Sequence, residues 1–249
     1  MMEKNNQHSA SDNQPRRAVV LLPTYNEKEN LENIVAAILA AAPVDIWILD
    51  DNSPDGTGAI ADRLVEEHAP RVRVEHRAEK QGLGPAYIAG FKLALAAGYE
   101  RILEMDADFS HPPEKLQALL ENAETYDLVL GSRWVTGGGT ENWPAHRQFI
   151  SKAGSFYART LLGVGIKDIT GGFKCFRREV LEALDLENIV SAGYMFQIEV
   201  TYQALQKGFS VHETPITFVE RRIGKSKMSR SIVLEAIIKV PILRLTGKK

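Results

Sequence analysis

Met105-Asp106-Ala107-Asp108-Phe109-Ser110-His111-Pro112-Pro113 is the stretch that decides the expected fold class. It follows the apolar residues Ile102 and Leu103, so it begins where a short buried strand would end. Open α/β proteins bind ligands at this edge of the sheet, and two carboxylates spaced i, i+2 there repel each other unless a cation lies between them. Hard divalent cations such as Mg²⁺ or Mn²⁺ prefer oxygen ligands and take ligand phosphates as further ligands. The stretch therefore indicates a metal–diphosphate site, although an Asp-x-Asp alone fits a solvated loop equally well.

Short apolar runs alternate with helical patterns along most of the chain. The expected strands lie at 18–22, 46–49, 72–75, 128–130 and 173–176, with one from Ile102 that carries Asp106 and an edge strand at 211–218. The expected helices lie at 28–41, 56–68, 85–97, 147–162 and 194–207, with one after Pro113 and a last one from Ser229. Alternation of this kind predicts βαβ units, so we expect an α/β fold with a single, mainly parallel sheet flanked by helices. The stretch 131–146 lacks periodicity and is expected to be a long binding loop.

The composition is that of an ordinary globular protein of 249 residues, with 44% hydrophobic and 25% charged residues. A formal net charge of −2 argues against a globally basic nucleic-acid-binding protein, so no nucleic acid partner is expected. The single cysteine, Cys175, excludes an internal disulfide and a cysteine-based metal cluster, and its position predicts a buried thiol. Residues 1–17 are polar and are expected to form a disordered leader. No run reaches the roughly 18 apolar residues that a membrane-spanning helix needs.

Three of the expected strands end in polar turns. The first turn is 23–27, the second is 50–56, and the third carries Asp106 and Asp108. Each turn has a plain structural interpretation, because Asn26 could cap a helix and 52–56 could be a simple turn. In a parallel sheet, however, the three strand ends converge, so together they predict a binding crevice. The run 82–84 has two glycines but lacks the third glycine of a dinucleotide fingerprint, which argues against an oxidoreductase.

These motifs resemble the inverting family 2 glycosyltransferases of the GT-A fold. The resemblance is carried by Pro23-Thr-Tyr-Asn-Glu27, Asp50-Asp51-Asn-Ser-Pro-Asp55, Met105-Asp-Ala-Asp108 and Gly131-Ser-Arg133. Further segments are similar to the polyprenol (dolichol) phosphate mannose synthases within that family. They are His111-Pro112-Pro113, Glu141-Asn142-Trp143-Pro144, Arg147, Ser151, Gly171-Gly172-Phe173, and Arg221 through Gly224 to Ser226-Lys227. The resemblance covers about 18–230, which is expected to be a single catalytic domain.

The resemblance implies roles for named residues. Residues expected to line the nucleotide pocket are Pro23, Tyr25, Glu27, Leu49 and Asp51. Asp106 and Asp108 would hold Mg²⁺ or Mn²⁺ on the diphosphate, with the backbone of Ala107 near the ribose. Ser110 stands where some relatives carry a glutamine metal ligand, and its weaker hydroxyl would act through water.

Four cations have phosphate-binding roles in the enzymes that this chain resembles. They are Arg133, Arg147, Arg221 and Lys227. Arginine and lysine suit both the recognition of an anionic acceptor and the stabilisation of a departing diphosphate. Without the motif, the run 221–227 would be an ordinary solvated basic run. His111 follows the metal motif directly, but the prolines after it favour a helix-start role.

The implied reaction is transfer of mannose from GDP-mannose to a polyprenyl phosphate with inversion, which releases GDP. A phosphate monoester has a second pKa of about 6, so it is mostly dianionic near neutrality and needs no protein base. Two alternatives stay open: a polyprenyl-phosphate glucosyltransferase that uses UDP-glucose, and a non-catalytic subunit on a glycosyltransferase scaffold.

The last segment, 231–249, is expected to be an amphipathic helix. Its apolar residues are Ile232, Val233, Ala236, Ile237, Val240, Ile242 and Leu243, and its basic residues include Lys239 and Arg244. Such a helix suits peripheral contact with a membrane surface, here the cytoplasmic face, or with a membrane-anchoring partner subunit. Packing on the core or at a dimer interface is the alternative.

Overall fold

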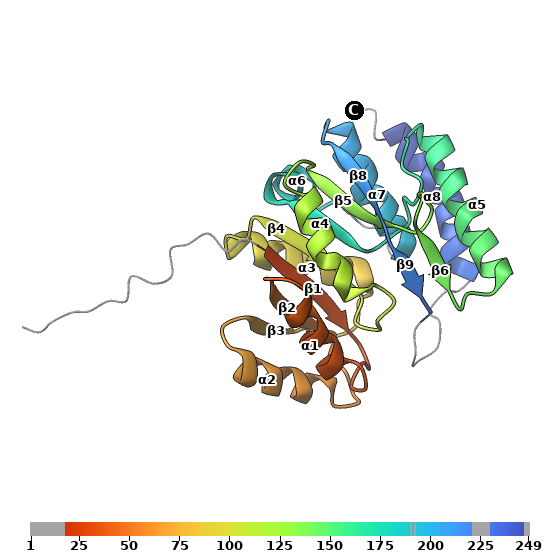
Figure 1. Ribbon diagram of the computed structural model, residues 1–249. Helices are drawn as coiled ribbons and strands as arrows, with labels where there is room; N and C mark the ends of the chain where they lie inside the picture. Colours follow the sequence, from red (N-terminus) through yellow and green to blue (C-terminus); the bar gives the residue numbers. More distant parts are fainter. Residues whose placement is uncertain (1–17, 190, 192, 221–229, 247–249) are drawn as a thin grey trace, which may run out of the picture.

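The computed structural model describes residues 18–189, 191, 193–220 and 230–246 (Figure 1). Its main sheet has seven strands in the order β3-β2-β1-β4-β7-β5-β8. These strands are β1 (Ala18–Thr24), β2 (Asp45–Asp50), β3 (Val72–His76), β4 (Arg101–Glu104), β5 (Leu128–Ser132), β7 (Lys174–Arg177) and β8 (Val211–Pro215). Strand β7 runs antiparallel to β4 and β5, and the other neighbouring pairs are parallel. The expected α/β fold with a mainly parallel sheet is confirmed.

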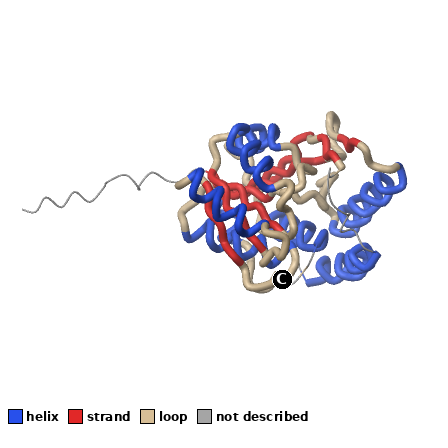
Figure 2. Tube along the Cα trace, turned by 90° about the horizontal axis from the view of Figure 1, so that it is seen from below, coloured by secondary structure: helices blue, strands red, loops and turns tan. Residues whose placement is uncertain are grey.

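Helices cover both faces of this sheet (Figures 1 and 2). The helices are α1 (Leu31–Ala41), α2 (Thr57–His68), α3 (Leu83–Ala96), the short 3₁₀ helix η1 (Pro113–Lys115), α4 (Leu116–Asn122), α5 (Ala145–Leu162), α6 (Arg178–Ala183), α7 (Gly193–Gln206) and α8 (Arg230–Thr246). Side chains alternate along β1, so Leu21 packs toward α3 and α7 in one core cluster, and Leu22 packs toward α1, α2 and α4 in the other.

The cysteine lies in the second cluster, as expected. Cys175 on β7 is a free, fully buried thiol. Burial raises the pKa of this thiol to about 12. It is therefore a packing residue and not a nucleophile.

Several boundaries differ from those expected. Helix α1 begins at Leu31 and not at 28, because the main-chain oxygen of Glu27 accepts the N–H groups of both Asn30 and Leu31 in a turn. The stretch 131–146 is not loop throughout, since it contains β6 (Gly139–Glu141). The single edge strand expected at 211–218 is two strands: β8 ends at Pro215, and β9 (Thr217–Val219) pairs in parallel with β6. Strands of three residues carry too little periodicity to be found from sequence, and helix α6 was also missed.

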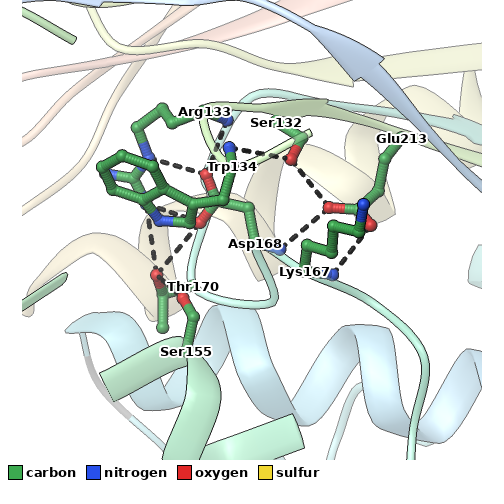
Figure 3. A network of polar contacts seen from close by, with 8 residues as sticks. All are labelled: Ser132, Arg133, Trp134, Ser155, Lys167, Asp168, Thr170 and Glu213. Carbon is green, nitrogen blue, oxygen red and sulfur yellow. Dashed lines mark hydrogen bonds and ion pairs between the residues drawn. The ribbon is translucent and has the colours of Figure 1, made fainter. Parts of the chain in front are cut away.

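The segment between α5 and β7 is fixed by a partly buried polar network (Figure 3). The Glu213 carboxylate on β8 accepts hydrogen bonds from Ser132 Oγ at 2.7 Å, Asp168 N at 2.8 Å and Lys167 N at 2.7 Å. The Asp168 carboxylate in turn accepts from Arg133 N at 2.9 Å, Nε at 2.7 Å and Nη2 at 2.7 Å. The Asp168 side chain is 0% exposed and that of Arg133 is 6% exposed, so the pair is shielded from water.

Replacing Asp168 by asparagine would leave the buried Arg133 guanidinium without its counter-charge. Removing one partner of a buried ion pair costs about 3–5 kcal/mol, so we expect Asp168→Asn to lower the free energy of unfolding by about that amount in a urea titration. Asp62→Asn is the matched control, because Asp62 pairs with His76 through a side chain that is 59% exposed. Its effect should stay within about 1 kcal/mol. Equal losses in the two variants would contradict the importance of the buried pair.

Candidate active site

The polar turns after β1, β2 and β4 open onto one cleft of about 430 Å³. Of the residues predicted to form the site, those that line this cleft are Pro23, Tyr25, Glu27, Asp51, Asp106, Ala107, Asp108, Arg133 and Arg147. Leu49 does not line it; this residue lies within β2, and its buried side chain packs in the core against Gly90 of α3. Ser110 is buried beside the cleft, and Arg221 and Lys227 lie outside the described residues.

The first two turns are hydrogen-bonded to each other. Asn26 N donates to Ser53 Oγ at 3.1 Å, and Glu27 N donates to Thr57 Oγ1 at 3.0 Å. Asn26 has a φ of +59° and is not a helix cap, since Asn30 occupies the position before α1. The turns therefore form one wall of the cleft as a unit.

Arg77 and Lys80 join Tyr25 and Asp51 at this wall, and sequence analysis missed both. Arg77 Nη1 donates to Asp51 Oδ1, and Lys80 Nζ lies 3.8 Å from the ring centroid of Tyr25. Burial raises the pKa of Asp51, and the Arg77 guanidinium opposes that rise. Arg77 directly follows β3, which lies beside β2 in the sheet. The strand order therefore brings Arg77 next to Asp51, and knowledge of that order would have predicted the contact. The wall offers an aromatic face beside a carboxylate, which suits a nucleoside.

The loop of the metal motif is held by hydrogen bonds from its backbone N–H groups to its own side chains. Ser110 N donates to Asp108 Oδ1 at 3.0 Å, and Phe109 adopts a φ of +61°. Asp106 N donates to His111 Nδ1 at 3.0 Å, so the ring proton is on Nε2. Burial lowers the pKa of His111, whose ring stacks on Phe173 at 5.1 Å. The expected helix-start role is wrong: η1 begins two residues later at Pro113, and His111 fixes the backbone of Asp106.

The donor set of this loop fits a hard divalent cation. Asp108 is 5% exposed and Asp106 is half-buried. Both residues belong to one loop and line the cleft. Ser110 Oγ is buried and has no hydrogen-bond partner in the described structure, which leaves one more oxygen beside Asp108. Within the described ranges, no group of three or more His, Cys, Asp or Glu side chains is placed to hold a metal. A cation there would need ligand or water oxygens to complete its shell.

Aromatic side chains surround Arg133 and Arg147, the two predicted phosphate-binding arginines that line the cleft. The guanidinium carbon of Arg133 lies 5.4 Å from the ring centroids of Trp134 and Phe218 and 5.5 Å from that of Trp143. The guanidinium carbon of Arg147 lies 4.0 Å from the centroid of Trp143. Trp143 therefore packs against both cations, each in the range of a cation–π interaction.

Two buried ionisable side chains that sequence analysis missed lie next to the metal loop. Glu104 at the end of β4 is opposite Lys174 of β7, and both side chains are 0% exposed. Burial raises the pKa of Glu104 to about 7 and lowers the pKa of Lys174 to about 8. Lys174 Nζ donates to the main-chain and side-chain oxygens of Gln197, which lines the cleft from α7. Lys174 thus joins α7 to the sheet, and its charge interacts with that of Glu104.

Comparison with known proteins agrees with this geometry. Residues 19–185 match the family described as glycosyl transferase family 2. A polyprenol monophosphomannose synthase of Mycolicibacterium smegmatis is 52% identical over 235 residues, which are 94% of this chain and 89% of the relative. An undecaprenyl-phosphate mannosyltransferase of Micrococcus luteus is 49% identical over 225 residues, 90% of this chain and 92% of the relative.

Solved structures share the fold at much lower identity. Glucosyl-3-phosphoglycerate synthase from Mycobacterium tuberculosis, in complex with Mn²⁺, UDP and glucosyl-3-phosphoglycerate, has a TM-score of 0.65 at 17% identity and covers 93% of this chain and 80% of that one. S. aureus TarS 1–349 in complex with UDP has a TM-score of 0.56 at 17% identity, covering 93% and 65%. The chain therefore belongs to glycosyl transferase family 2, and its resemblance to the polyprenol phosphate mannose synthases of that family is confirmed.

Proposed function

We propose that this protein transfers mannose from GDP-mannose to a polyprenyl phosphate, with inversion, to give a β-linked polyprenyl phosphate mannose and GDP. The observation that supports it most is one cleft lined both by a pair of carboxylates, Asp106 and Asp108, and by two arginines, Arg133 and Arg147. That arrangement suits two phosphorylated substrates. The names of the two relatives, at 52% and 49% identity, supply the polyprenyl phosphate and the mannose.

Binding and orientation of both substrates follow from the side chains of the cleft. Tyr25 and Asp51 would contact the nucleoside, with Pro23 and Glu27 beside them. Asp106 and Asp108 would hold Mg²⁺ or Mn²⁺ on the diphosphate, where the cation would neutralise charge on the departing GDP. Arg133 and Arg147 would bind phosphate oxygens, and Arg221 and Lys227 stay predicted partners in that task.

The acceptor would supply its own nucleophile. A phosphate monoester is mostly dianionic near pH 7, so an oxygen of it can attack the anomeric carbon while the bond to GDP breaks on the opposite side. Among the described residues that line the cleft, His111 carries the only imidazole, and its Nδ1 already accepts the Asp106 N–H. This occupation is consistent with an acceptor that needs no general base.

A lipid acceptor requires access to a membrane, and α5 and α8 carry the surface that supports such contact. The large apolar side chains that are exposed in the described structure all lie on these helices: Phe149, Ile150, Phe156 and Leu161 on α5, and Ile237, Ile238, Ile242 and Leu245 on α8. The helices lie side by side (Figure 1), and Tyr157 Oη donates to Ile237 O at 2.9 Å. The sequence predicted membrane contact for α8 alone and gave no such prediction for α5.

Helix α8 partly packs on the core and partly exposes apolar side chains, so each of the two expectations for it, packing and membrane contact, has some support. Its Val240 is fully buried in the core, and Arg244 Nη1 donates to Leu162 O at 2.7 Å, so the helix packs on the domain. Ile237, Ile238, Ile242 and Leu245 of the same helix are exposed. No described helix is long and apolar enough to cross a bilayer. We propose peripheral contact through this surface; the cytoplasmic face and an anchoring subunit stay predictions.

The reaction and the metal site can be tested together. Asp108→Asn keeps the size of the side chain but replaces the negatively charged carboxylate that would bind the cation by a neutral amide. We therefore expect kcat/KM for transfer from GDP-mannose to fall at least about 100-fold. The assay measures mannose in organic-soluble product, with Mn²⁺ and with chelator. Asp185→Asn, at an exposed position, is the matched control and should retain activity. An active wild type with an equally active Asp108→Asn variant would refute the site, and binding of UDP-glucose in place of GDP-mannose would refute the donor.

The membrane contact predicts a separate effect. Phe149 and Phe156 are 74% and 59% exposed and lie seven residues apart, on one face of α5. Replacing both by serine removes apolar area from that face, so we expect binding to anionic vesicles in a sedimentation assay to fall about tenfold. Activity on a short-chain polyprenyl phosphate in detergent should not change. Unaltered sedimentation would show that this surface serves another purpose.

A further inference from the structure

The two described arginines of the cleft have carboxylate partners of very different burial. Asp168 is 0% exposed and accepts three N–H groups from Arg133. Glu220 is 34% exposed and accepts from Arg147 through Nη1 alone, at 2.5 Å. An incoming anion cannot displace Asp168 without leaving a buried charge unpaired, whereas Glu220 can return to water at small cost. The first pair is therefore permanent, and the second is exchangeable.

Arg147 is also incompletely paired in its present state. Its side chain is 13% exposed, and its Nε is buried without a hydrogen-bond partner in the part of the chain that the structure describes. A buried N–H without an acceptor is unfavourable, and the planar guanidinium suits an anion with several oxygens. The Trp143 ring, 4.0 Å away, holds the plane of the group at the cleft.

The short two-stranded sheet holds Glu220 in place. Glu220 directly follows β9, and its N–H donates to Glu141 O at the end of β6 at 3.1 Å. The backbone is thereby fixed, so only the side chain has to move when Arg147 changes partner.

We propose that Glu220 is an exchangeable counter-ion that makes the acceptor site selective for phosphate. Its carboxylate occupies Arg147 in the absence of acceptor, and the acceptor phosphate displaces it and takes over Nη1 together with the unpaired Nε. A neutral polyprenol cannot replace the carboxylate, so it leaves Arg147 paired and is excluded. This inference rests on the proposed function, because it needs a polyprenyl phosphate as the acceptor.

Glu220→Gln tests the exchange. Glutamine keeps the size and one acceptor oxygen but loses the charge that competes with phosphate. A partly exposed ion pair shifts an equilibrium by a factor of about five or less, so we expect the KM for a short-chain polyprenyl phosphate to fall about two- to fivefold, with the KM for GDP-mannose unchanged. Glu141→Gln is the matched control, because it makes the same charge change at an exposed position of the neighbouring strand. Its acceptor KM should equal that of the wild type.

The outcomes separate this inference from the function on which it rests. A wild type that forms no lipid product would refute the proposed function and the exchange with it. If the wild type is active but Glu220→Gln has an unchanged or higher acceptor KM, the exchange alone is refuted. An equal fall in Glu141→Gln would assign the effect to general surface charge, which also refutes the specific exchange.

Discussion

The ion pair between Arg133 and Asp168 joins the end of β5 to the segment that connects α5 with β7, and the rest of the cleft wall depends on it. Two charges removed from water are stable only when their hydrogen bonds are satisfied, and here the carboxylate accepts three N–H groups. Thr170 extends the contact, since Arg133 Nη2 donates to its Oγ1 at 3.2 Å and that oxygen lies 3.2 Å from Ser155 Oγ of α5 (Figure 3). The strand end, the connecting segment and the helix are thereby held in one arrangement.

The cleft is lined by charges of both signs. The carboxylates Asp106 and Asp108 belong to the loop after β4, and the arginines Arg133 and Arg147 come from elements later in the chain. Arg133 is neutralised by a buried partner, so it contributes directed N–H groups more than net charge. Arg147 has a partner that solvent can reach, so its charge stays available. Two residues of the same type thus present different electrostatics because of the burial of their partners.

Features confined to one strand end could be predicted from sequence, and features that join distant stretches could not. Asp106, Asp108 and the turns after β1 and β2 are local motifs, and the parallel sheet brings them together as expected. Glu104 with Lys174, and Arg147 with Glu220, pair residues about seventy positions apart, so no spacing rule reveals them. Leu49 differs from the other residues expected in the nucleotide pocket because it lies within β2, where its side chain packs in the core, whereas Asp51 follows the end of the strand and lines the cleft.

Two stretches of sequence contribute different parts of the cleft lining. The turns with Tyr25, Asp51, Asp106 and Asp108 come from 23–111, and the aromatic and arginine residues come from 131–218. The small sheet of β6 and β9 lies almost wholly in the second stretch and is separate from the main sheet. If the proposed roles hold, substitutions confined to the second stretch would change the preference for the group that receives the sugar and leave binding of the activated sugar intact.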